Sequence, residues 1–155
     1  MNIMKLGLSW MLIAGSLFAA GLSLTPGTGD KCAVCGMFVS EFKTWVSAVE
    51  FKDGGRAWFD GPKDLFTYLH DLKQYAPGRR AADIGEILVT DYYSTKAIRA
   101  RDAFFVAGSD VMGPMGAELA PFIRKADAET FLKDHKGTKI LPFDEVTPAI
   151  LSSLK

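Results

Sequence analysis

Residues 45–59 read WVSAVEFKDGGRAWF and define the first recognisable unit of the fold. Large apolar side chains alternate with smaller or polar ones over residues 45–51, a period typical of a half-buried strand. Residues 52–55, KDGG, supply glycines for the positive φ angles of a tight turn. Residues 56–59 return as a second strand. The stretch therefore predicts a β-hairpin.

A helix and a third strand are expected directly after this hairpin. Asp60 can cap the free N–H groups of the first helical turn, in which Pro62 is tolerated. Four apolar residues recur at helical spacing and would form the buried face: Leu65, Phe66, Leu69 and Leu72. The helix should end near Tyr75, and residues 84–90 should form the third strand.

The second half of the chain repeats this order of elements. The expected elements are strands at residues 102–109 and 117–122, a helix at 127–135, a strand at 139–143 and a short terminal helix. Pro121 suggests that the strand at residues 117–122 lies at a sheet edge. We therefore expect an α+β fold of two small ββαβ modules arising from an apparent internal duplication.

The first residues of the chain have the composition of an export signal. Residues 6–24 form an uncharged apolar run behind Lys5, with small residues near a plausible cleavage point. An uncleaved single-span anchor reaching residue 24 is the alternative, because the run is long enough to cross a bilayer. The expected division is a signal peptide at residues 1–21, a linker at 22–31, a first module at 32–96 and a second at 97–155.

Composition excludes some classes of function. The formal net charge of the 155 residues is zero, and no basic run is interleaved with aromatic residues. Nucleic-acid binding therefore has no support. Hydrophobic residues make up 48% of the chain, enough for a packed core.

Sulfur is concentrated in two short segments, KCAVCGM at residues 31–37 and VMGPMG at residues 111–116. Each methionine there has a glycine neighbour, which leaves the sulfur open to an ion. Several soft donors in two short segments are the pattern that Cu(I) selects. The candidate ligands are Cys32, Cys35, Met37, Met112 and Met115.

The C-x-x-C pair also allows a disulfide or a redox function. Export would place Cys32 and Cys35 where disulfides persist, although so short a loop gains little stability from a cross-link. A thioredoxin-like motif should open a helix after a strand. Here the motif follows a linker instead.

No catalytic constellation is recognisable. His70 is expected on the polar side of its helix, and His135 near a helix C-terminus as a structural residue. Two such histidines build no Ser-His-Asp or Cys-His arrangement. We therefore expect no enzyme.

Five short motifs follow one another along the mature part of the chain: Cys35-Gly36-Met37, Trp58-Phe59, Phe105-Val106-Ala107-Gly108-Ser109, Met115-Gly116-Ala117-Glu118 and Pro121-Phe122. In this combination the chain resembles the NosL family, the nitrous oxide reductase accessory proteins. The resemblance spans essentially the whole mature chain.

This resemblance implies a periplasmic Cu(I) metallochaperone with a fold of two similar ββαβ modules. The implied partners are nitrous oxide reductase as copper client and a membrane ABC-type maturation complex. By position, Cys35, Met37 and Met115 match the family's conserved sulfur residues. Since Cys35 and Met37 are two apart, an extended segment would project both to one side. Met115 would then complete a three-coordinate Cu(I) site.

The sequence departs from the family pattern at two points. Many members are lipoproteins, whereas Asp30-Lys31 precedes Cys32 here, so no lipid anchor is expected. A tether through the N-terminal segment remains open. The additional Cys32 could supply a second thiolate or suit a different client.

Three functions compete at this point. Copper delivery is the leading one, and an exported thiol–disulfide exchange protein using Cys32 and Cys35 is the alternative. A structural adaptor in a maturation complex is the third. Loss of Met37 or Met115 should weaken copper binding but leave a redox function intact.

Overall fold

The computed structural model describes residues 21–154. The export segment expected at residues 1–21 lies outside this range except for its last residue. Among the described residues, no helix is both long and apolar enough to traverse a membrane.

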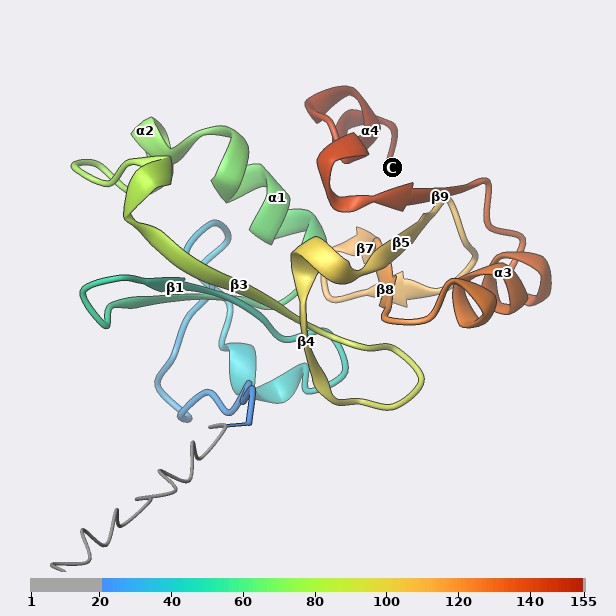
Figure 1. Ribbon diagram of the computed structural model, residues 1–155, viewed down its shortest axis with the longest axis horizontal. Helices are drawn as coiled ribbons and strands as arrows, with labels where there is room; N and C mark the ends of the chain where they lie inside the picture. The colour runs from blue at the N-terminus through green and yellow to red at the C-terminus, as the bar shows by residue number, and fades with distance from the viewer. Residues whose placement is uncertain (1–20, 155) are drawn as a thin grey trace, which may run out of the picture.

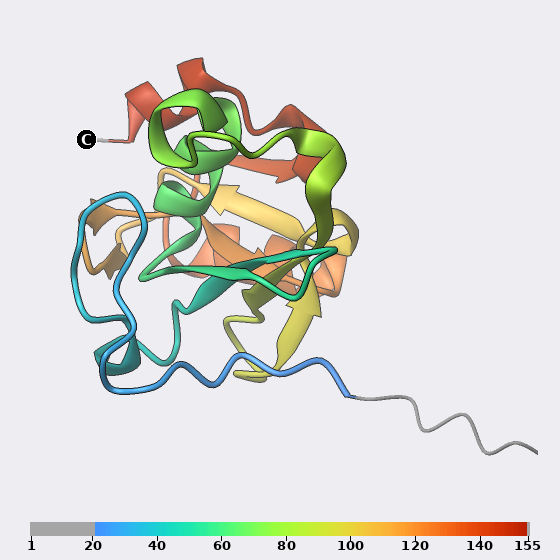
Figure 2. The same cartoon turned by 90° about the vertical axis from the view of Figure 1, so that its left-hand side faces the viewer.

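A four-stranded antiparallel sheet of order β2-β1-β3-β4 forms the first half (Figure 1). Its elements are the 3₁₀ turn η1 (Val39–Glu41), β1 (Ser47–Phe51), β2 (Arg56–Phe59), α1 (Pro62–His70), α2 (Leu72–Tyr75), η2 (Ala81–Asp83), β3 (Ile84–Thr90) and β4 (Ala97–Arg99). The hairpin expected over residues 45–59 is present, with Ser47 paired to Phe59 and Glu50 to Arg56. Helices α1, α2 and α4 lie together on one side of this sheet (Figure 2).

The second half contains a three-stranded antiparallel sheet of order β8-β5-β9. Its elements are η3 (Ala100–Asp102), β5 (Phe104–Ala107), β6 (Met112–Gly113), β7 (Gly116–Ala117), β8 (Ala120–Phe122), α3 (Lys125–Asp134), β9 (Lys139–Pro142), η4 (Phe143–Glu145) and α4 (Pro148–Ser153). Strand β8, which carries Pro121, is at the sheet edge as expected.

The α+β class is confirmed, and both halves contain a ββαβ unit with the same strand order. In each unit the first strand lies between the second and the third, as β2-β1-β3 and β8-β5-β9. Their origin by duplication stays a prediction. The first sheet extends past the expected division after residue 96, because β4 pairs with β3. The domain boundaries stay a prediction as well.

One hydrophobic core joins the two halves. Phe66 of α1 lies edge-on to Phe105 of β5, with ring centroids 5.0 Å apart, and 5.1 Å from the ring of Phe143. Phe66 is only 2% exposed. A smaller cluster around Phe122 and Phe131 fills the space under α3. Helix α1 therefore packs against strands of both sheets.

The start of α1 differs from the sequence prediction. Gly61, not Asp60, is the N-cap residue and offers no capping side chain, while the Lys63 N–H in the first turn donates to Glu118 from the second half. Asp60 instead points into the protein and is only 1% exposed. Gly61 in turn leaves room for Glu118, because a Cβ there would collide with the Glu118 side chain. Asp60 does not cap the helix, and its Oδ2 accepts a hydrogen bond from Cys35 Sγ instead.

Candidate metal centre

The two cysteines lie in a closed loop attached to the end of β2. The Cys32 N–H donates to the Met37 carbonyl at 2.8 Å, and the Gly36 N–H donates to the Cys32 carbonyl at 3.0 Å. The Ala33 N–H donates to the carbonyl of Trp58 at 2.9 Å, which fixes the loop against the sheet. Both thiols are free, Cys32 buried and Cys35 half-buried.

This loop corrects one expectation about its geometry. Cys35 lies in a turn, and Gly36 follows with a φ of +79°. Only glycine adopts such a backbone at little cost. The extended segment that would have projected Cys35 and Met37 to one side is therefore not formed. Met37 itself is half-buried.

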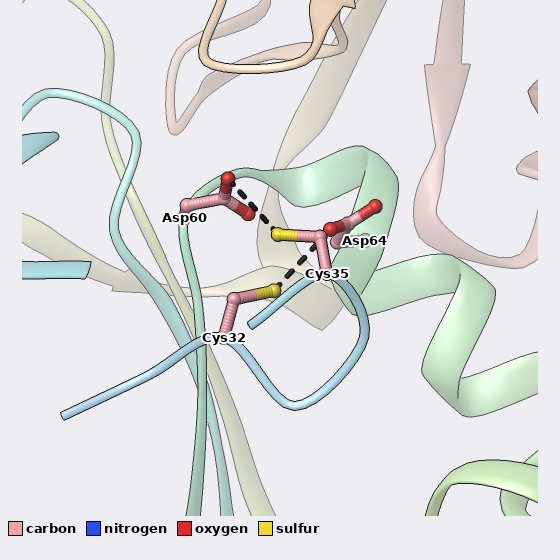
Figure 3. Close-up of side chains that lie close together, drawn as sticks. All are labelled: Cys32, Cys35, Asp60 and Asp64. Carbon is pink, nitrogen blue, oxygen red and sulfur yellow. Dashed lines mark hydrogen bonds between the residues drawn. The ribbon is translucent and has the colours of Figure 1, made fainter. Parts of the chain in front are cut away.

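Two aspartates converge on the thiols from the other side (Figure 3). The Cys32 Sγ donates to Asp64 Oδ2 at 3.2 Å, and the Cys35 Sγ donates to Asp60 Oδ2 at 3.4 Å. One ligand atom from each of these four residues lies within 4.8 Å of the other three. We call Cys32, Cys35, Asp60 and Asp64 the thiol–carboxylate cluster. Two of its members come from the loop, and two flank the start of α1.

Burial keeps the two thiols of this cluster protonated when no ion is present. It raises the pKa of the Cys35 thiol to about 11, and it raises the pKa of Cys32 further. Burial also raises the pKa of Asp64. Both thiols are therefore neutral at physiological pH and serve as hydrogen-bond donors to the carboxylates. A cation that binds here must displace protons.

One atom of the cluster lacks a partner. Among the residues that the structure describes, the buried Oδ1 of Asp60 has no hydrogen-bond partner. A buried polar atom without a partner is rare in folded proteins and often marks a ligand or ion. Two thiols and two carboxylates, one of them incompletely bonded, are a suitable donor set for a metal ion.

Replacing Asp60 by alanine should stabilise the metal-free protein by roughly 1 kcal/mol. The substitution removes a buried carboxyl whose Oδ1 has no partner, and such a group carries a desolvation penalty. Urea unfolding of the metal-free protein measures the change, with Asp134→Ala on the exposed end of α3 as control. A loss of stability in Asp60→Ala would contradict this account, because it would mean that the bond from Cys35 Sγ to Asp60 Oδ2 outweighs the penalty.

The other two methionines lie in a small hairpin beside the start of α1. Residues 112–117, comprising β6, β7 and their turn, are called the methionine hairpin. Met112 is 59% exposed and Met115 is 48% exposed. Lys63 of α1 donates from Nζ to the carbonyls of Met115 and Ala117, each at 2.8 Å. The fold thus brings the second sulfur segment to the helix turn that carries Asp64.

A buried glutamate connects the hairpin with α1. Glu118 is 3% exposed, and its Oε1 accepts hydrogen bonds from the backbone N–H of Lys63 at 2.6 Å and of Leu119 at 2.9 Å. Burial raises the pKa of its carboxyl to about 8. Glu118 directly follows the last residue of the methionine hairpin and links it to the start of α1.

The histidines do not join the cluster. His70 Nε2 lies 2.7 Å from the carbonyl of Val146, and His135 Nδ1 lies 3.3 Å from Asp110 Oδ1. The exposed His70 is therefore bonded to the backbone of another segment, which its position on the helix did not reveal. His135 is a structural residue, packed on Phe131 with ring centroids 4.4 Å apart.

Sequence reasoning missed the acidic half of the cluster. The sequence pattern predicts that Asp60 caps a helix, and it gives Asp64 no distinguishing role. The only signal in the sequence is the presence of two carboxylates four residues apart, directly after the second strand of the hairpin. The roles of Lys63 and Glu118 left no comparable signal, because they depend on a contact between the two halves.

Comparison with known proteins agrees with this picture. Residues 23–151 match the family model NosL. The chain is 29% identical over 128 residues to the copper-binding lipoprotein NosL of Stutzerimonas stutzeri, covering 79% of this chain and 64% of that protein. It therefore spans just under two thirds of that relative's length.

A solved structure is also similar. The crystal structure of the copper chaperone NosL from Shewanella denitrificans matches with a TM-score of 0.69 and 30% identity, covering 83% of this chain and 96% of that one. Both relatives are named for binding or delivering copper, not for catalysis. This agrees with the expectation that the chain is no enzyme.

Proposed function

The chain belongs to the NosL family, and on this premise we propose that it is an exported, periplasmic copper chaperone that carries Cu(I). The observation that best supports this proposal is that two free thiols lie close to two buried carboxylates, beside a hairpin with two exposed methionines. Its clients would be nitrous oxide reductase or the maturation complex of that enzyme.

The proposed copper ligands are the sulfur atoms of both segments. Cys35 is the central one, because its thiol is half-buried and so accessible both to the cluster and to solvent. Met115 is proposed as a thioether ligand from the second half, and Cys32, Met37 and Met112 as further donors. Thiolate and thioether sulfur favour Cu(I) over harder ions. Copper is the cargo in this scheme, so a partly open site suits its transfer.

The geometry argues against attachment through a lipid on Cys32. The Cys32 side chain is 3% exposed, and its Sγ donates to Asp64. A thioether-linked lipid would remove that proton and would have to leave a buried position. We therefore propose that any membrane attachment runs through the N-terminal segment.

The thiol–disulfide exchange alternative is weaker on electrostatic grounds. Exchange proteins activate their attacking cysteine by lowering its pKa. Here burial raises the pKa values of both thiols, and neighbouring carboxylates add to this effect. The metal-free cysteines are therefore poor nucleophiles.

An anaerobic Cu(I) titration against a competing chelator tests the proposal. The reduced protein should bind one equivalent of Cu(I) tightly. Met115→Ala should weaken Cu(I) binding by at least about 10-fold, because removing even a residue that only orients a metal ligand costs about that much affinity. Ile123→Ala, a similarly exposed apolar residue in the same half, is the control and should have no effect.

The other outcomes separate the competing functions. Failure of the wild-type protein to compete for Cu(I) would reject copper delivery and favour an adaptor. Tight binding that is insensitive to Met115→Ala would reject the contribution of the hairpin. A reversible Cys32–Cys35 redox couple without copper binding would favour the exchange protein.

A further inference from the structure

The methionine hairpin is too small to hold its position alone. Strands β6 and β7 form a separate two-stranded sheet with only two residue pairs, Met112 with Ala117 and Gly113 with Gly116. Even a full two-stranded hairpin is marginally stable in water. Its placement must therefore come from contacts with the rest of the protein.

Lys63 supplies two of these contacts from the first turn of α1. Its ammonium donates to the carbonyl oxygens of Met115 and Ala117, one on the turn and one on β7. A hydrogen bond from a charged donor is stronger than a neutral one. Both bonds reach the main chain of the hairpin and leave the Met115 thioether unrestrained.

Glu118 supplies the matching contact from the other side. It follows β7 directly, and its Oε1 accepts the backbone N–H of Lys63 at 2.6 Å. Glycines make room for this side chain on both elements. A Cβ on Gly61 would collide with Glu118, and a Cβ on Gly113 would lie 2.8 Å from its Cγ. The hairpin base and the helix start are therefore joined through one buried side chain.

We propose that Lys63 and Glu118 are positioning residues that clamp the methionine hairpin onto the start of α1 and so set the place of Met115 relative to the thiol–carboxylate cluster. Lys63 lies between Asp60 and Asp64 in the chain, so the element that carries the carboxylates also holds the hairpin. The consequence for copper rests on the proposed function, whereas the clamp itself does not.

The clamp explains how one site can hold an ion yet release it. The backbone of Met115 is fixed by Lys63, while its side chain is 48% exposed and can change rotamer. A partner's ligand can approach the thioether without any movement of the hairpin. The backbone carbonyl of Met115 thus holds the hairpin in place, and the thioether sulfur of the same residue is left to exchange the ion.

Hydrogen exchange of residues 112–117 in the metal-free protein tests the clamp directly. In Lys63→Leu the hairpin amides should exchange at least about 10-fold faster, because local opening becomes easier. In Lys63→Arg, which keeps a charged donor, the hairpin amides should exchange slowly, as they should in the control Lys73→Leu on α2.

The Glu118 variants test the other side of the clamp. In Glu118→Gln, which keeps an acceptor for the Lys63 N–H, the hairpin amides should also exchange slowly, whereas in Glu118→Leu they should exchange faster. Unchanged exchange in Lys63→Leu would overturn the clamp.

A double-mutant cycle then tests its effect on copper. Lys63→Leu should weaken Cu(I) binding by roughly 10-fold, within the range for residues that orient a ligand. This loss should disappear in the Met115→Ala background, because the ligand being positioned is gone. An equal loss in both backgrounds would show that Lys63 does not act through the hairpin. Absence of Cu(I) binding by the wild-type protein would reject the proposed function, and the exchange experiment would still decide the clamp.

Discussion

Replacing Cys35 by serine is expected to weaken Cu(I) binding by more than about 100-fold. Loss of a residue that merely orients a ligand costs roughly 10–100-fold in metal affinity, and Cys35 is proposed as a ligand itself. Serine keeps nearly the same shape but offers a hard oxygen that Cu(I) does not favour. Competition titration under anaerobic conditions measures the loss. The thiolate-to-copper charge-transfer absorption should weaken in parallel.

Two comparisons make this result interpretable. Circular dichroism and urea unfolding of metal-free Cys35→Ser should match the wild type closely, because the Sγ of Cys35 is only partly buried. Cys32→Ser is the paired variant and reports whether the additional cysteine binds as well. Wild-type affinity in Cys35→Ser would contradict the proposed site.

The apparent Cu(I) affinity should rise steeply with pH. The pKa of Cys35 is raised to about 11 and that of Cys32 is raised further, so both thiols are protonated well above neutrality. Each thiolate that binds copper releases one proton, which makes binding about 10-fold tighter per pH unit. If both bind, the gain between about pH 6 and pH 8 is on the order of 10⁴-fold, and if only Cys35 binds it is about 100-fold.

The slope of log Cu(I) affinity against pH therefore gives the number of thiolates that bind the ion. Competition titrations across this range, corrected for protonation of the chelator, should give a slope that falls by one proton in Cys35→Ser. Cys32→Ser should lower the slope only if Cys32 is a ligand. A flat profile for the wild type would mean that copper does not bind through either thiolate.

The elements of the fold could be predicted because their signals are local. The alternation over residues 45–51 and the helical spacing from Leu65 to Leu72 each lie within one element. Strand β4 and the strands β6 and β7 were not foreseen, because two or three residues are too few to show a period.

The site could be predicted only in part, for a different physical reason. The cysteines and methionines were recognisable because their chemistry is rare and concentrated. Aspartates are common on surfaces, and Asp60 meets Cys35 only because the fold brings together residues 25 positions apart in the chain. No local pattern carries such information. The sulfur ligand set itself stays a prediction until copper binding is measured.

The contact of Phe66 with Phe105 has a consequence for cooperativity. Because this aromatic pair ties α1 to β5, neither ββαβ unit can unfold while leaving the other's core closed to water. Heating should therefore give a single calorimetric transition, although the topology repeats. An ion held at the start of α1 would raise the midpoint of that whole transition, by an amount set by its concentration relative to its dissociation constant. The melting temperature then reports cargo loading without any label.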